Sequence, residues 1–354
     1  MEIQKLLETT IKRDASDLHL VVGALPTLRV DGRLKAIEGM DILTPKKIEA
    51  LVFSLVTDEQ KDILLNNKEV DFSFALGEIA RFRVNAYYQK GYIAAALRLI
   101  PSRIRSMEEL GLPKICQNFT RLPQGLVLVT GPTGHGKSTT LAAMIEDINK
   151  ERAAHIITVE DPIEYVFPHR KGLISQRELH LDTHSWEIAL RSVLREDPDI
   201  VLVGEMRDYE TIAAALTVAE TGHLVFATLH TNNAPQTIDR IIDVFPEHQQ
   251  SQVSAQLASV LEGIISQRLI PAIGGGRILA TELMFATSAV RSLIRDKKAH
   301  QLDNIIATSY DIGMQSLERS LVHHIKAGKI SLEDAKAYTL KPDDVIRMMK
   351  SEKE

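Results

Sequence analysis

Residues 131–138, GPTGHGKS, match the phosphate-binding loop pattern G-x-x-x-x-G-K-[ST] in full. The apolar run GLVLVT precedes them and STTLAAMIEDINK follows, which predicts a strand before the loop and a helix after it. Backbone N–H groups at such a helix N-terminus can wrap phosphates, so a glycine-rich turn that binds nothing is the weaker interpretation. The predicted nucleotide-binding residues are Gly131, Pro132, Thr133, Gly134, His135, Gly136, Lys137, Ser138 and Thr139.

Two side chains of this loop have expected roles toward ATP and Mg²⁺, the predicted ligands. Lys137 is expected to reach the β- and γ-phosphates, and the Ser138 hydroxyl to bind Mg²⁺. His135 occupies a variable position of the pattern and is expected to contribute only its backbone N–H.

The segment DIVLVGEMRD predicts another strand end at this site, and it places Glu205 directly after a buried apolar run. A typical second strand of such a site ends in an aspartate that supports Mg²⁺, whereas this one has Gly204 followed by Glu205. Glu205 is expected to order Mg²⁺ through water, to polarise the attacking water, or both. The alternative is a solvated strand terminus, which the neighbouring phosphate-binding loop disfavours.

Two further strand ends carry polar side chains. TVEDPIEY places Glu160 and Glu164 after HIITVE, where ligands of an open α/β sheet lie. Both are candidates for positioning water or supporting Mg²⁺, and a structural role in the turn is the alternative. In TGHLVFATLHT, His223 and His230 flank one strand and are too far apart to share a metal without other ligands. His230 is therefore predicted to sense the γ-phosphate, or else to be an ordinary hydrogen-bonded strand-end histidine.

The elements that must position these residues form an α/β domain. The apolar runs GLVLVT, HIITVE, DIVLVGE and HLVFATLH alternate with helical segments, as buried parallel strands do. Ser185, Asp208 and Pro235 are expected at helix starts. Apolar residues at helical spacing predict one further amphipathic helix, followed by a hairpin at residues 274–276; these residues are Val253, Leu257, Val260, Leu261, Ile264 and Ile265.

The first hundred residues have a different pattern. Residues 3–11 have helical periodicity, Asp31-Gly32 predicts a tight hairpin, and VDFSFAL, ARFRVNAYYQ and YIAAALRLI are strand-like, with a helix expected at residues 45–66. We therefore predict an α+β domain at residues 1–100, a linker with a short helical turn at 101–113, and the α/β domain at 114–354, helical from about residue 285.

Composition limits the class of protein. With 44% hydrophobic and 25% charged residues the chain is typical of a globular protein, and no apolar run approaches the ~20 residues of a spanning helix. A net charge of -5 gives no general attraction to nucleic acid. The single cysteine, Cys116, excludes an internal disulfide and fits a reducing cytosol.

The chain resembles the secretion ATPases that power type II secretion and type IV pili, and among them the pilus retraction ATPases. The resemblance lies in five motifs and in their order along the chain: ASDLHL, GPTGHGKST, ITVEDPIEY, LVGEMRD and TGHLVFATLHTNNA. The resemblance covers essentially the whole chain. It implies a homohexameric ring in which a PAS-like N-terminal domain lies against the RecA-like ATPase domain of a neighbour. It also implies that Arg83 and Arg98, which spacing alone leaves as weak candidates, are arginine fingers acting across that boundary.

The segment AVRSLIRDKK is similar, though not identical, to a retraction-ATPase motif usually written AIRNLIRE. Ala289, Val290, Leu293 and Ile294 form an apolar stripe, and a cationic stripe of Arg291, Arg295 and Lys298 is expected to face outward. A solvated helix face is the alternative. The residues expected to couple hydrolysis to motion are Arg291, Leu293, Ile294 and Arg295. The single cysteine cannot supply the four-cysteine zinc motif of the assembly ATPases, and their longer N-terminal extension is not expected here.

The resemblance implies a Mg²⁺-dependent, ATP-hydrolysing motor that withdraws pilin from a type IV pilus. The expected partners are an inner-membrane platform protein and the pilus base, with no nucleic acid. The expected location is cytoplasmic, peripheral to the inner membrane, without direct insertion. Two alternative functions remain open: that of an accessory retraction paralogue, and that of a pilus-assembly or type II secretion ATPase. A RecA-like DNA translocase and a non-catalytic nucleotide-binding scaffold are more distant alternatives.

Overall fold

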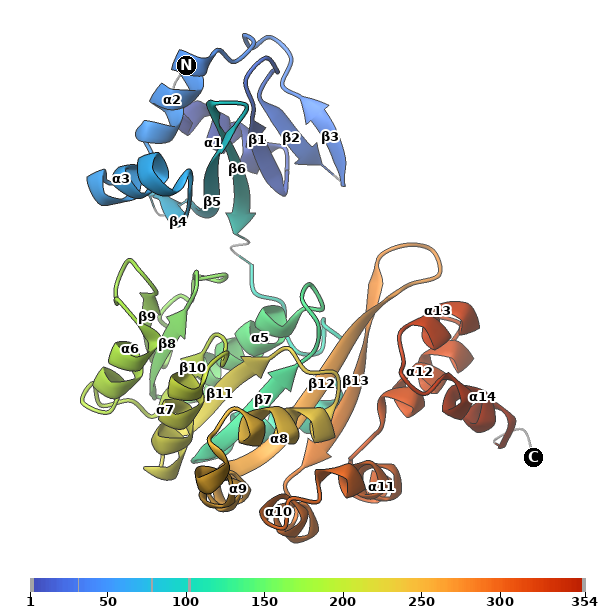
Figure 1. The fold of residues 1–354 in the computed structure, drawn as a ribbon. Coiled ribbons are helices and arrows are strands. Elements are labelled where there is room, and N and C mark those ends of the chain that lie inside the picture. Colours follow the sequence, from blue (N-terminus) through green and yellow to red (C-terminus); the bar gives the residue numbers. More distant parts are fainter. Residues whose placement is uncertain (1–2, 31, 78, 101–102, 352–354) are drawn as a thin grey trace. The chain divides into compact units, whose positions relative to one another are not determined.

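A computed structural model of the chain describes residues 3–30, 32–77, 79–100 and 103–351 (Figure 1). The chain divides into two compact units. The first contains the residues up to Arg103 together with Pro162–Val166, and the second contains Ile104–Asp161 and the chain from Phe167 onward. Each unit has its own sheet and its own buried core.

The first unit is an α+β structure built on one antiparallel sheet with strand order β3-β2-β1-β6-β5-β4. Its strands are β1 (Asp17–Leu20), β2 (Thr27–Val30), β3 (Arg33–Ala36), β4 (Glu69–Leu76), β5 (Ala80–Gln89) and β6 (Tyr92–Ile100), and its helices are α1 (Ile3–Lys12), α2 (Pro45–Phe53) and α3 (Asp58–Asn67). Alternate residues of β5, Phe82, Val84 and Ala86, are completely buried because successive side chains of a strand point to opposite faces.

The helix predicted at residues 45–66 is wrong as a single element, because the segment forms α2 and α3 instead. The segment is divided at Thr57, which caps the start of α3. The Thr57 hydroxyl accepts from the Gln60 N–H, while the Gln60 side chain accepts from the Thr57 N–H. This reciprocal capping box starts a new helix and competes with continuing the old one. The predicted hairpin corresponds to the pairing of β2 with β3; Asp31 itself lies outside the described residues.

The second unit is an α/β structure. Its strands are β7 (Gly125–Thr130), β8 (His155–Glu160), β9 (Leu173–Glu178), β10 (Ile200–Val203), β11 (Leu224–Leu229), β12 (Leu261–Pro271) and β13 (Arg277–Phe285). Its helices are η1 (Lys114–Cys116), α4 (Gln117–Thr120), α5 (Lys137–Glu151), α6 (Trp186–Val193), α7 (Tyr209–Glu220), α8 (Ala234–Asp243), α9 (Glu247–Val260), α10 (Ser288–Arg295), η2 (Ala299–Gln301), α11 (Leu302–Thr308), η3 (Tyr310–Ile312), α12 (Leu317–Lys326), α13 (Leu332–Ala337) and α14 (Pro342–Ser351).

The strands of this unit have the order β13-β12-β7-β11-β10-β8-β9, and every neighbouring pair is parallel except β12 with β13 (Figure 1). The central strands β7, β10 and β11 are buried along their whole length, as the continuous apolar runs predict for strands covered on both faces. Since parallel strands end at the same edge of a sheet, the segments after β7, β8, β10 and β11 meet there.

The single helix predicted through Val253–Ile265 is wrong in its second half. Helix α9 ends at Val260, and Leu261 begins β12, which pairs with both β7 and β13. The apolar residues near this boundary fit either period, so spacing could not decide. Within β12, Gly263 lets the backbone approach the Phe119 ring closely, since a Cβ there would lie 2.4 Å from that ring. The three glycines Gly274–Gly276 form the predicted hairpin turn between β12 and β13.

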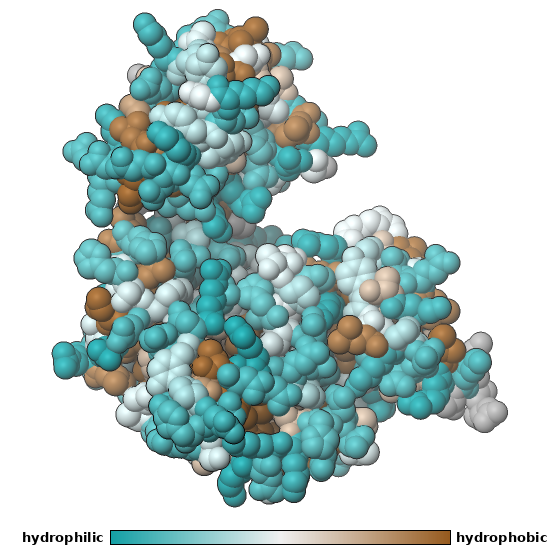
Figure 2. Space-filling view, in the orientation of Figure 1, coloured by the Kyte–Doolittle hydropathy of each residue, from teal (hydrophilic) through white to brown (hydrophobic). Residues whose placement is uncertain are grey.

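The described part of the molecule contains no helix with both the length and the apolar character of a membrane span. The face seen in Figure 2 is mostly hydrophilic, with hydrophobic residues in small separate patches. In the predicted linker, residues 101–102 lie outside the described residues, and a single turn forms at residues 107–111. Cys116 is completely buried beside this segment.

Candidate nucleotide site

The phosphate-binding loop joins β7 to α5 and depends on its glycines. Gly131 has φ +145°, and a Cβ on it would lie 2.5 Å from the carbonyl oxygen of Gln267 in β12. Gly136 precedes α5 in the left-handed conformation and provides no side-chain cap. The first N–H groups of a helix have no partner within the helix, so the start of α5, including Ser138 and Thr139, has donors suited to phosphate.

The Lys137 side chain is buried and lies against its own loop. Its ammonium donates to the carbonyl oxygens of Gly131 at 2.9 Å and Pro132 at 3.3 Å, and lies 3.3 Å from His230 Nδ1. Phosphate oxygens would compete with these neutral carbonyls for a charged donor, and charge-assisted hydrogen bonds are the stronger ones. The lysine is thus placed where a nucleotide could recruit it.

His230 bridges the loop to the acidic strand end. Its Nδ1 lies 3.2 Å from the Thr133 hydroxyl, on the same side as Lys137, and its Nε2 lies 3.1 Å from Glu205 Oε1. A neutral ring with its proton on Nε2 satisfies these contacts, because Nε2 then donates to the carboxylate and Nδ1 accepts from Lys137 or Thr133. The parallel pairing of β7, β11 and β10 brings these residues together from distant parts of the sequence.

Glu205 lies in the short connecting segment between β10 and α7. Burial alone would raise the pKa of its carboxyl, but the hydrogen bonds from Arg207 and His230 and the charge of Arg207 lower the pKa below its ordinary value. Arg207 Nε donates to Glu205 Oε1 at 2.7 Å. Glu205 is therefore a carboxylate at neutral pH, suited to orient a water molecule or to accept its proton.

Arg207 was not predicted as a site residue, although a signal was present in GEMRD. An arginine two positions after the key glutamate is near enough in the chain to pair with its carboxylate, as Arg207 does. Asp161, after β8, also acts electrostatically on Arg207.

The other two acids of the predicted site lie in different surroundings. Glu160 is buried, and its Oε1 accepts from the Thr158 hydroxyl at 2.6 Å and from Gln176 Nε2 at 3.2 Å. The end of β8 nevertheless lies beside the Glu205 segment, since a Cβ on Gly204 would be 3.3 Å from the Glu160 Cα. Glu164 is exposed and falls within the segment grouped with the first unit.

The side chain of His135 has a role beyond the backbone N–H expected of it. Its Nδ1 accepts from the Leu269 N–H of β12 at 2.9 Å, and its carbonyl accepts from Gln267 Nε2 at 2.6 Å. Burial, together with the charges of Arg268, Arg277 and Lys137, lowers the pKa of His135 and keeps it the neutral acceptor this contact needs. The loop is thus fastened to β12, a contact between positions 134 residues apart.

The residues present fit a magnesium ion bound with a nucleotide. The Ser138 hydroxyl and the ionised Glu205 carboxylate are hard oxygen donors of the kind Mg²⁺ prefers. In the described parts of the chain, no three His, Cys, Asp or Glu side chains gather into a metal site of their own. A magnesium ion here would take its remaining ligands from phosphates and water, as is usual for this ion.

The two candidate arginine fingers lie in the first unit, each beside a carboxylate. Arg98 Nε donates to Asp17 Oδ1 at 2.9 Å, and its side chain remains 71% exposed. Arg83 lies 3.5 Å from Asp71, and both of these side chains are about half exposed. Neither arginine is a bare surface cation, because each lies beside a carboxylate.

The outward cationic stripe predicted for residues 289–298 is wrong in part. Helix α10 ends at Arg295, so Lys298 lies beyond it, and Ala289 is exposed while Val290 and Ile294 are completely buried. Arg295 is exposed as expected, and Leu293 packs partly against the core.

Arg291 turns back into its own unit. Its guanidinium donates to the carbonyls of Ala286, Ala258 and Ser259 and forms a 2.7 Å ion pair with Glu262. The last carbonyls of α9 have no partner within the helix, and a cation satisfies them well. Arg291 is therefore a structural cap of α9 rather than a surface charge.

In the second unit, a glycine loop follows β7 of a mostly parallel sheet, and a lysine, a histidine and a glutamate are joined at the carboxyl edge of that sheet. These features define a P-loop ATPase domain. The chain belongs to the type II/IV secretion system protein family, whose model matches residues 1–275. It is 48% identical over 344 residues to the type IV pilus retraction ATPase PilT of Pseudomonas aeruginosa, covering 97% of this chain and 100% of that protein.

It is also 39% identical to the type IV pilus ATPase PilU of the same organism, over 99% of this chain and 92% of that protein. A crystal structure of the pilus retraction motor PilT with bound ADP superposes with a TM-score of 0.92 at 48% identity, covering 98% of this chain and 100% of that one. The predicted family and the fold class, an ATPase domain preceded by a smaller α+β domain, are confirmed.

Proposed function

We propose that the chain hydrolyses ATP at the carboxyl edge of the second sheet, and that the motor it forms retracts a type IV pilus. The observation that carries the chemical part is His230, which contacts both Lys137 of the phosphate loop and Glu205. A single side chain thereby links the group that binds phosphate to the group suited to act on water.

In the proposed reaction, the loop N–H groups and Lys137 bind the phosphates, and Ser138 and Glu205 hold Mg²⁺, Glu205 through water. The ion, when bound, neutralises charge on the phosphate oxygens. Glu205 orients the attacking water, and its lowered pKa keeps it ionised for this task. Recruitment of Lys137 by the γ-phosphate removes its contact with His230 Nδ1 and leaves the Thr133 hydroxyl as the neighbour of that nitrogen, so the histidine responds to the presence of that phosphate.

Arg83 and Arg98 are proposed to complete the site of a neighbouring copy in a homohexamer. The chemistry asks mainly for positioning and charge stabilisation, which an arginine supplied in trans can provide. Support comes from the exposure of the Arg98 guanidinium, which is fixed at Nε and open to solvent elsewhere along its side chain.

The pilus part of the proposal rests on family membership and near full-length similarity to a retraction ATPase. We infer a cytoplasmic protein held at the inner membrane by its partners, the platform protein and the pilus base. Of the four predicted coupling residues, Arg295 and Leu293 of α10 are the proposed coupling surface, without Arg291 and the buried Ile294. A retraction role is favoured over an accessory one because identity to PilT, 48%, exceeds identity to PilU, 39%.

Two experiments test this function. Purified protein should hydrolyse ATP only with Mg²⁺ present, and DNA should not stimulate it; stimulation by DNA would favour a translocase, and no turnover would favour a scaffold. Deleting the gene in a piliated host should give surplus surface pili and no twitching. Loss of pili would identify an assembly ATPase, and normal twitching in a strain that retains a second retraction ATPase would identify an accessory paralogue.

A further inference from the structure

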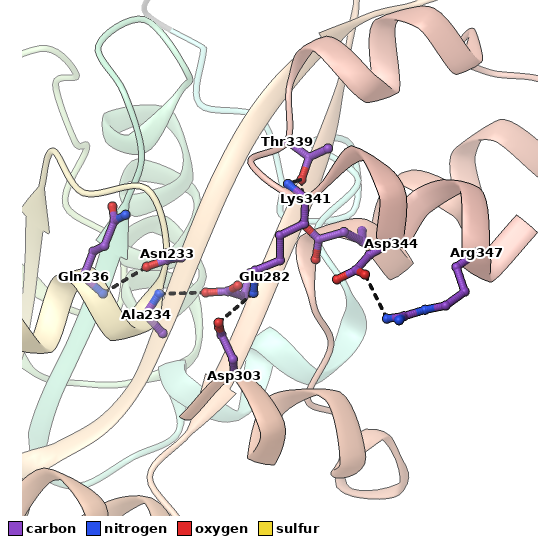
Figure 3. A network of polar contacts seen from close by, with 10 residues as sticks. Asn233, Ala234, Gln236, Glu282, Asp303, Thr339, Lys341, Asp344 and Arg347 are labelled. Atoms are coloured by element: carbon purple, nitrogen blue, oxygen red, sulfur yellow. Dashed lines mark hydrogen bonds and ion pairs between the residues drawn. The ribbon is translucent and has the colours of Figure 1, made fainter. Parts of the chain in front are cut away.

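A carboxylate in the interior of the second unit holds the start of the helix that follows His230. Glu282 of β13 is 6% exposed, and its Oε1 accepts from the Ala234 N–H at 2.7 Å (Figure 3). Ala234 is the first residue of α8, so this N–H has no partner within the helix. An anion at that position also interacts favourably with the helix dipole.

The same segment is fixed at a second point by β12. Arg268, also buried, donates to Asn232 Oδ1 at 2.8 Å and to the Asn232 carbonyl at 3.3 Å. Side chains from neighbouring strands therefore hold Asn232 and Ala234, which lie two and four positions after His230. A shift of this segment would change how the imidazole of His230 meets Glu205.

Glu282 also faces a cluster of charges from the C-terminal helices, shown in Figure 3. Asp303 of α11 forms a 2.6 Å ion pair with Lys341, and Glu318 of α12 accepts from Thr339 at 2.6 Å. The Thr339 hydroxyl in turn accepts from the Lys341 N–H at 3.0 Å. Lys341 therefore enters the cluster from the short segment between α13 and α14.

These groups set the protonation of Glu282. Burial raises its pKa to about 7; the Ala234 hydrogen bond and Lys341 oppose the rise, while Asp303 and Glu318 add to it. The charge of Glu282 also acts on Arg268 of β12, whose pKa burial lowers and Glu282 raises. A neutral carboxylic acid is a weaker acceptor than a carboxylate and loses the interaction with the helix dipole.

We propose that Glu282 is a positioning residue of the ATPase site: it fixes the His230 segment through Ala234, and the C-terminal segment controls its charge through Lys341. Movement of Lys341 away from the cluster favours the protonated acid and loosens the first turn of α8. The C-terminal helices thereby gain influence over the site without touching the nucleotide. The inference rests on the proposed hydrolysis at Glu205.

The first test replaces Glu282 with Gln, which keeps the shape and an acceptor for Ala234 but cannot ionise. At about pH 8, kcat should fall about fivefold relative to wild type, the difference between a charged and a neutral acceptor, with nucleotide affinity preserved. At about pH 6 the two proteins should differ little, since wild-type Glu282 is then protonated. A ratio of the two kcat values that stays constant across this range would overturn the proposal.

The second test shifts the midpoint of the pH dependence of kcat in opposite directions. Lys341→Met removes a favourable cation and should move the midpoint of the wild-type pH dependence to higher pH, whereas Asp303→Asn removes a like charge and should move it lower. Arg347→Gln is the control, because Arg347 pairs with Asp344 on α14 and does not act on Glu282. If Glu282 has a purely packing role, the variants should lose stability without shifting the midpoint in opposite directions. That result would refute the inference, even if Glu282→Gln failed to fold.

The two hypotheses remain distinguishable in the same assay. Wild-type turnover, and its loss in Glu205→Gln, tests the site itself. If wild type is active and Glu205→Gln is not, but the midpoint stays unchanged in Lys341→Met and Asp303→Asn, the function stands and the role of Glu282 falls.

Discussion

Arg83 and Arg98 lie directly opposite each other in the antiparallel pair of β5 and β6. Residues opposite in such a pair share a face, and like charges there are destabilising. The pair is flanked by carboxylates from the two neighbouring strands, Asp17 of β1 beside Arg98 and Asp71 of β4 near Arg83. Two adjacent guanidinium groups are costly for folding alone, and they are suited to an anion supplied from outside the unit.

If these arginines complete the site of a neighbouring copy, mixing Arg98→Ala protein with Lys137→Ala protein should restore ATPase activity above the sum of the two separate mutants. Some interfaces of a mixed ring then pair an intact loop with an intact arginine. Turnover of the mixture is the measurement, with native mass spectrometry to verify that mixed rings form. Activity that never exceeds the sum, in verified mixed rings, argues against a finger in trans.

Asp17 should make the stability of the protein depend on acid. Burial raises its pKa, but hydrogen bonds from Ser16 and Arg98 and the Arg98 charge outweigh burial and lower the pKa below 3.8. Because the folded pKa is lowered, the stabilisation is complete above the unfolded pKa and is lost as pH falls through the folded value. Thermal unfolding should therefore show less acid sensitivity in Asp17→Asn than in wild type, and equal sensitivity would contradict the assignment.

Replacing Glu205 with Gln should leave ATP bound but slow its hydrolysis by about a hundredfold to a thousandfold, a typical loss for one oriented polar group. Lys137→Ala should instead abolish binding or turnover, because it removes the charged donor to the phosphates. Nucleotide affinity and kcat measured on both variants separate the two effects. Near-normal turnover in Glu205→Gln would transfer the role to Glu160 or Glu164.

Arg291→Ala and Arg295→Ala should behave differently although both remove a cation from α10. Loss of Arg291 leaves the end of α9 and Glu262 without their partner, and should reduce the free energy of unfolding by about 1–3 kcal/mol. Arg295 is exposed, so Arg295→Ala should keep the unfolding temperature and basal ATPase activity.

In a piliated host, Arg295→Ala should give surplus pili and no twitching, the phenotype expected of full deletion. Normal twitching by this variant would remove α10 from the coupling surface. An unfolding temperature of Arg291→Ala equal to that of wild type would show that the guanidinium does not stabilise α9.

The sequence predicts the site well wherever a residue acts through its neighbours in the chain. Gly131–Ser138 adjoin their own strand and helix, and Ser185, Asp208 and Pro235 occupy the helix starts expected of them. Parallel pairing then brings Glu205 and His230 to one edge, because strand ends of an α/β sheet coincide.

Two errors are local: the Thr57 capping box divides the helix predicted at residues 45–66, and Arg207 lies only two positions after Glu205. The other errors concern contacts between distant positions. Arg291 reads as a surface cation until the end of α9 is known to lie beside it, and Glu282 reads as an ordinary polar residue of a strand until α8 supplies its partner. The boundary at Val260 depends on pairing with β7, which local periodicity does not contain.

The single cysteine has a practical consequence for following motion in this protein. Burial raises the pKa of the Cys116 thiol to about 12, so almost none of it is the reactive thiolate at neutral pH. Maleimide dyes should therefore ignore the native protein and label only introduced surface cysteines. One such cysteine in each unit would carry a donor and an acceptor fluorophore, and energy transfer between them could be followed through a catalytic cycle without first removing a natural thiol.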